Sequence, residues 1–85
     1  MTDDRQLKTY VWYENQCYFV STIMRESSAM GYPSRYAETI TWEFDWSTNE
    51  RGKMVDQDGS GPAFQQHMRV VEDFYRHGKR SDEDG

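Results

Sequence analysis

The sequence predicts an α+β domain: a small antiparallel β-sheet of three to four strands, arranged as a meander, with one C-terminal helix packed across one face. Four runs rich in β-branched and aromatic residues come first and are separated by turn-forming residues. A later segment repeats its apolar residues every three or four positions, as an amphipathic helix does. At 85 residues the chain is too short for a second core, so these elements must share one.

The strands are assigned from β-branched and aromatic content and from the turn residues between them. The expected strands are 9–13, 17–24, 36–46 and 53–57. The segments 14–16 and 47–52 have the polar residues of tight turns, and 26–34 contains the glycine and proline of a longer loop. We expect one domain over 9–78, with a flexible N-terminus at 1–8 and a charged, flexible tail at 79–85.

The helix is expected to start near Pro62 and to end before Gly78, which are typical residues for a first helical turn and for a position just past the last one. Its apolar stripe is predicted to face the sheet. The stripe consists of Phe64, His67, Met68, Val71, Phe74 and Tyr75.

The apolar residues of the third strand fall on alternate positions, which assigns them to one face. The residues that share that face are Tyr36, Ile40, Trp42, Phe44 and Trp46. We expect Ile40, Trp42 and Phe44 to lie under the helix as the sheet's half of the core, with Trp46, at the end of the strand, only partly covered. Both hairpin strands carry large side chains at both parities, so aromatic residues remain on the outer face. This favours contact with another surface, most simply in a homodimer. The alternative is that these rings lie flat with their polar ends in water.

The predicted partner-binding surface combines that outer face with nearby charged residues. Its candidate residues are Tyr10, Trp12, Phe19, Arg25, Arg35, Glu43, Asp45 and Trp46. The net charge of -5 disfavours direct nucleic-acid binding, which needs clustered cations. It instead favours a protein partner with a basic surface. The acidic residues available for such a partner are Glu38, Glu43, Asp45, Glu50, Asp56 and Asp58.

The cysteine count and the hydropathy pattern indicate the cellular compartment that we expect for the protein. Cys17 is the single cysteine, so no intrachain disulfide forms, and its apolar neighbours predict a buried thiol. The N-terminus has no secretory apolar segment and no long apolar run occurs elsewhere. We therefore expect a cytoplasmic protein with no membrane association.

The sequence offers few residues for catalysis, metal binding or cofactor binding. His67 and His77 lie nearly three helical turns apart and cannot share a small site. The run DQDGSG (56–61) resembles the start of a calcium loop, but its twelfth position is a histidine where a bidentate glutamate is needed. We expect no catalytic residue, metal or cofactor. The function predicted first is a noncatalytic protein-interaction module.

Two alternatives come from other classes of function. Arg25, Ser27, Ser28 and Arg35 surround one loop and offer the forked donors of a small-ligand or anion-binding site. A weak enzyme built on Cys17 and His67 is the other, although no third group that would orient them is indicated.

The strand AETITWEFD and the helix QQHMRVVEDF resemble short uncharacterised proteins of tailed bacteriophages and prophages. The resemblance covers about half of the chain, over 36–77, and departs from their pattern at Thr41. The matching positions are Glu38, Thr39, Trp42, His67, Val70 and Val71. It implies an accessory protein of the host cytoplasm that inhibits or modulates a host protein by occupying its surface.

Overall fold

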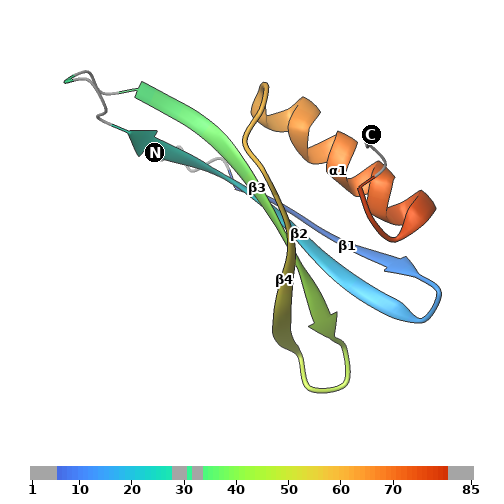
Figure 1. Cartoon of the computed structure of the whole chain (residues 1–85). Coiled ribbons are helices and arrows are strands. Elements are labelled where there is room, and N and C mark those ends of the chain that lie inside the picture. The colour runs from blue at the N-terminus through green and yellow to red at the C-terminus, as the bar shows by residue number, and fades with distance from the viewer. Residues whose placement is uncertain (1–5, 28–30, 32–33, 81–85) are drawn as a thin grey trace.

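The computed structural model describes residues 6–27, 31 and 34–80. The elements are β1 (Leu7–Tyr13), β2 (Gln16–Ser27), β3 (Ser34–Asp45), β4 (Glu50–Asp58) and α1 (Ala63–His77). The strands form one antiparallel sheet in the order β1-β2-β3-β4. Helix α1 lies across one face of β1, β2 and β3 (Figure 1). The predicted α+β meander with one covering C-terminal helix is therefore confirmed.

The elements are longer than the local sequence indicates. β1 begins inside the segment expected to be a flexible N-terminus, and β2 continues to Ser27. β4 begins at Glu50, in the segment expected to be a turn. Pairing explains the extension, because the ladder between β2 and β3 continues from Cys17 opposite Phe44 to Ser27 opposite Ser34.

The two tight turns shape the sheet. Glu14 and Asn15 both have a left-handed backbone, with φ of 48° and 70°, which is the conformation of a two-residue type I′ hairpin turn. The β3–β4 turn closes with the amide of Asn49 donating to the carbonyl of Asp45 at 2.8 Å. Two register irregularities opposite Thr41, Trp42 and Phe44 then bend this hairpin away from the helix (Figure 1).

The core between helix and sheet is built on small side chains. Val11 and Val20 of the sheet pack against Val70 and Phe74 of α1, and all four are buried. On β3 the helix covers the face with the alternate small residues. These are Ala37, Thr39 and Thr41.

The expectation that Ile40, Trp42 and Phe44 lie under the helix is therefore wrong, because they occupy the opposite parity of β3. Relative to the expected orientation, the helix is rotated about its own axis, so a different stripe of residues faces the sheet. Phe64 and Met68, expected in the core, are 64% and 45% exposed. Its buried residues are Gln66, His67, Val70 and Phe74. Small side chains let the helix backbone come close to the sheet, which a layer of indole rings would prevent.

A chain of buried hydrogen bonds joins the helix to three strands. Thr39 donates to Oε1 of Gln66 at 2.6 Å, so the Thr39 oxygen accepts from Thr22 at 2.5 Å. The Thr22 oxygen must then accept from Nδ1–H of His67, at 2.8 Å. A neutral ring leaves Nε2 to accept from the Thr9 hydroxyl, also at 2.8 Å. The network therefore specifies one tautomer of a neutral imidazole.

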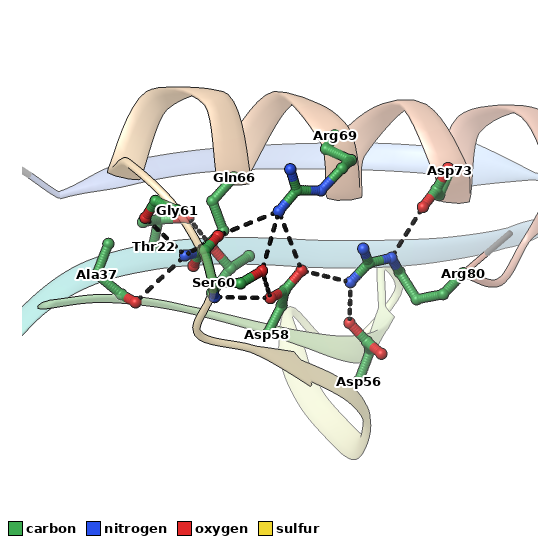
Figure 2. Close-up of polar contacts among 11 residues, drawn as sticks. Thr22, Ala37, Asp56, Asp58, Ser60, Gly61, Gln66, Arg69, Asp73 and Arg80 are labelled. Carbon is green, nitrogen blue, oxygen red and sulfur yellow. Dashed lines mark hydrogen bonds and ion pairs between the residues drawn. The ribbon is translucent and has the colours of Figure 1, made fainter. Parts of the chain in front are cut away.

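The amide group of Gln66 completes this network at the start of the helix. Its Nε2 donates to the carbonyls of Ser60 at 3.0 Å and of Ala37 and Gly61 at 3.3 Å each (Figure 2). Gln66 is fully buried, and these bonds satisfy both ends of its amide.

A second polar cluster ties the segment after the helix to β4. Arg80 donates to Asp73 at 2.8 Å and to Asp56 and Asp58 at 3.0 Å each (Figure 2). Burial alone would lower the pKa of this guanidinium, but the three carboxylates outweigh burial and raise it. Arg80 was expected in the flexible tail; its side chain is only 19% exposed.

The position of the core predicts which phenylalanine matters for folding. We expect Phe74→Ala to lower the free energy of unfolding by about 3–5 kcal/mol, because a ring buried against Val11 and Val20 is lost. The control Phe64→Ala removes a ring that is mostly exposed, so it should change the free energy of unfolding by less than about 0.5 kcal/mol. Urea unfolding of dilute protein measures both. Equal losses of unfolding free energy in the two variants would contradict the observed helix orientation, in which Phe74 faces the sheet and Phe64 does not.

The buried imidazole predicts a pH dependence of stability. Desolvation lowers the pKa of His67, so the folded state binds this proton less readily than the unfolded state. Stability should therefore fall as the pH drops below about 6.5, the ordinary value, and level off below the folded pKa. His67→Gln should flatten this part of the stability–pH curve, which urea unfolding at a series of pH values measures.

Candidate protein-interaction surface

The sheet face opposite α1 gathers aromatic side chains from three adjacent strands. The register places Tyr10 opposite Phe19, and Phe19 opposite Trp42, so their rings lie on one face. We call this surface the aromatic face. It comprises Tyr10, Trp12, Phe19, Trp42, Phe44 and Trp46.

These rings pack on one another across the strands. Phe19 is stacked between Tyr10 and Trp42, with ring centroids 4.9 and 5.7 Å away. Phe44 meets the Tyr10 ring edge-on at 5.0 Å, and Trp12 meets Trp46 in the same manner at 6.1 Å. Such cross-strand aromatic pairs contribute about 0.5–1.5 kcal/mol each beyond the area they bury.

The aromatic face has a buried floor and an exposed rim. Phe19 and Phe44 are 9% and 6% exposed, whereas Tyr10, Trp12 and Trp46 are 50%, 49% and 65% exposed. Two further exposed side chains of this face are Tyr36 and Met54. The rim therefore leaves large apolar groups in water although the floor is already well packed.

At one end of this face, a pocket of about 460 Å³ opens between the β1–β2 and β3–β4 turns. Trp12, Cys17, Phe44 and Trp46 supply its apolar lining. Its remaining lining residues are Asn15, Gln16, Glu43, Asp45, Ser47 and Gly52. An apolar hollow with a polar border is typical of a site that accepts an apolar side chain and orients it by hydrogen bonds.

Three cations lie on or beside the aromatic face. The Arg51 guanidinium lies 4.4 Å from the centre of the Trp42 ring, in a cation–π contact. Lys8 shares the parity of Tyr10. Arg25 is on the same side and pairs with Glu38 at 3.1 Å. Glu43 and Asp45 lie at the border of the pocket on the same face.

The acidic residues predicted to meet a basic partner are mostly engaged within the chain. Glu43 is opposite Tyr18, whose ring packs on Phe74, so it has the helix-side parity of β3, and it also borders the pocket beside Phe44 and Trp46. Asp45 accepts hydrogen bonds from the hydroxyl and amide of Ser47, which lower the pKa of its carboxyl and close the turn.

The two arginines of the predicted anion loop do not converge. Arg35 is opposite Glu26 and shares the parity of Ala37 on the helix side, whereas Arg25 lies on the outer side. Ser28, which that prediction also used, lies outside the described residues. The described geometry therefore gives no support to this alternative.

Cys17 and His67 lie on opposite faces of the sheet. Cys17 packs with Phe19 and Phe44, while both ring nitrogens of His67 are bonded to threonines on the helix side. Burial also raises the pKa of the Cys17 thiol, which keeps it protonated. These two residues do not form a nucleophile–base pair.

No family model, curated protein or solved structure matches this chain. Within 6–27, 31 and 34–80, no three His, Cys, Asp or Glu side chains are grouped so that they could hold a metal ion. Asp56 and Asp58, from the calcium-loop-like run, bind Arg80. Helix α1, the single helix in the described ranges, is not long and apolar enough to cross a membrane.

Sequence reasoning named Tyr10, Trp12, Phe19 and Trp46 as candidates but did not name other residues on this side of the sheet. The missed residues are Trp42, Phe44, Tyr36, Met54 and Arg51. The signal that could have found them is the alternation of small residues with rings along β3, since a helix packs closest on the small ones.

The floor of the aromatic face predicts the reactivity of Cys17. Its thiol is 2% exposed with a raised pKa, so we expect a thiol reagent to label the folded protein on the order of 100-fold more slowly than the urea-unfolded chain. The rate of colour release from an aromatic disulfide reagent measures this. The control Ser47→Cys, in a Cys17→Ser background, is exposed on the nearby turn and should react at the rate of the unfolded chain. Fast labelling of native Cys17 would contradict a packed floor.

Proposed function

We propose that this protein is a noncatalytic interaction module that binds another protein through its aromatic face. The observation that supports this is the exposure of Tyr10, Trp12 and Trp46 above a floor that is already packed. These rim positions lie outside the helix core, which is on the other side of the sheet.

The energetics favour a protein partner. Tryptophan, tyrosine and arginine are the residues that dominate binding energy in protein interfaces, and this face presents all three together. Trp12 and Trp46 flank the pocket, which suits an inserted apolar side chain of the partner. The rings are held by one another, so little conformational freedom is lost when a partner binds.

The chemistry of the partner follows from the same surface. An apolar segment fits the rings, and an acidic or carbonyl group fits Arg51 and Lys8 at the border. The basic partner expected from the net charge gains no support, since Glu38, Asp56 and Asp58 are already paired with arginines. A host protein blocked by a phage-type accessory protein is one setting for such a module, and it rests on the sequence resemblance alone.

The test compares the immobilised wild-type protein with the double variant Trp12→Ser/Trp46→Ser in a bacterial lysate. We expect a partner retained by the wild type to lose affinity by roughly 30-fold or more in the variant, since removing one hot-spot ring costs about 2 kcal/mol or more. Retention should persist in high salt, because apolar contacts are not screened. Titration calorimetry with the recovered partner gives the affinities.

The matched control is Arg76→Ser, which removes a side chain of 63% exposure from the helix and leaves the aromatic face intact. It should bind as the wild type does. Undiminished binding by the tryptophan variant, or equal loss in the control, would refute the aromatic face as the binding surface.

A further inference from the structure

Strand β1 is an open edge of the sheet. Among the described strands it pairs only with β2, which leaves one row of its backbone amides and carbonyls without a partner strand there. Charges and bulges commonly protect such an edge against pairing. The other edge, β4, has both, since it carries Glu50, Arg51 and Lys53 and its register is irregular. The seven residues of β1 include one charge, Lys8, and their register with β2 is uninterrupted.

The hairpin turn determines which backbone groups of β1 point away from β2. Tyr13 and Gln16 flank the two-residue turn and lie opposite each other, so they form a hydrogen-bonded pair. Hydrogen-bonded and non-hydrogen-bonded pairs alternate along an antiparallel ladder. The outward N–H and C=O groups therefore belong to every second residue before Tyr13. These residues are Trp12, Tyr10 and Lys8.

The same three residues present their side chains on the aromatic face. Tyr10 and Trp12 form part of its exposed rim, and Lys8 shares their parity. A strand that paired with β1 would place a side chain directly beside each of them, with Cβ atoms about 4.5–5.5 Å apart. One occupant could thus bind the open backbone groups and cover the exposed rings together.

The helix side of this edge is apolar as well. His67 bonds a threonine of β1, whereas Arg69 pairs with Asp58 of β4, so these residues mark the two flanks of α1. At about 100° per residue, Phe64 and Tyr75 fall on the flank of His67, toward β1. Both rings are mostly exposed. Side chains of an added strand that point to the helix side would lie beside this flank.

The edge and the helix flank run side by side over a similar length. Thr9 bonds His67, and the ring of Tyr13 lies against Gly78, so β1 and α1 run in the same direction. The seven residues of β1 span roughly 20 Å. The two exposed rings of the flank are eleven residues apart on the helix, which is roughly 16 Å. One extended segment can therefore contact the edge and the flank along their whole length.

We propose that the protein partner of the aromatic face contributes an extended, apolar segment that pairs with β1 as a fifth strand. Its backbone bonds the outward groups of Lys8, Tyr10 and Trp12. Its alternate side chains lie beside the aromatic rim on one face and beside Phe64 and Tyr75 on the other. This inference rests on the proposed function, because it specifies the conformation in which the partner of that surface binds.

A separate strand fits this edge better than a second copy of the chain. Helix α1 contacts β1, β2 and β3, so its axis lies near the middle strand, β2. Pairing of two β1 edges would hold the two helices about three strand spacings apart, roughly 14 Å. Packed helices need about 8–10 Å. A second copy would therefore leave the apolar flanks of both helices uncovered.

Peptide selection tests the strand pairing. A displayed library of random nine-residue peptides, selected on the immobilised wild type, should enrich segments with alternating apolar residues and no central proline. Fluorescence polarisation with the best labelled peptide gives the affinity. Lys8→Pro should weaken binding about tenfold or more, because proline removes an outward N–H. The matched control Lys8→Gln loses only the charge and should stay within about threefold of the wild type; circular dichroism checks that both variants are folded.

N-methylation of the selected peptide tests the pairing without changing the protein. Methyl groups on alternate backbone amides should abolish measurable binding, and those on the intervening amides should have little effect, because only every second amide of a strand faces its neighbour. Methylation effects that do not alternate, equal affinities of the two Lys8 variants, or the absence of any enriched peptide overturn the proposal.

The variant Trp12→Ser/Trp46→Ser separates this inference from the proposed function. Peptide binding that depends on the tryptophans but not on alternate methylation would refute the strand and leave the proposed function standing. Alternating methylation effects with undiminished binding by the tryptophan variant would support the strand and refute the aromatic face. A dimeric wild type in light scattering, with a monomeric Lys8→Pro variant, would assign the edge to a second copy and overturn the proposal.

Discussion

The buried hydrogen-bond chain between α1 and the sheet is the constraint on which the rest of this structure depends. Apolar contacts tolerate sliding, but His67 and Gln66 are buried and need particular oxygens on Thr22 and Thr39. A helix rotated or shifted by one residue would leave these polar atoms unpaired, at a cost of about 1–3 kcal/mol for each. The network thus specifies one helix position, and with it the sheet face that the helix covers.

That choice of face explains why so many rings remain outside. The helix covers the alanine and threonine positions of β3, so Trp42 and Phe44 turn away from it. They reach partial burial through Tyr10 and Phe19 on neighbouring strands. The molecule therefore has one core closed by the helix and a second cluster that is open on one side. An open cluster of this size is unusual for a small monomer and is the observation on which the proposed binding surface rests.

The open face of the sheet combines several features in one place. The aromatic face has rings, a pocket and nearby cations, which suit a different protein with an apolar segment.

The sequence by itself determined the classes of the elements, their order and the position of the turns. Alternation in 36–46, the small polar turns and the repeat in 63–77 are local signals, and local geometry follows them. It also indicated that aromatic residues of the first two strands remain on the outer face, without deciding which parity faces the helix. Only the tertiary structure decided which face the helix covers, because that depends on hydrogen bonds between residues far apart in sequence, such as Thr22 and His67. Hydrophobicity favoured the rings for the core, and the fit of a polar network to small side chains outweighed it.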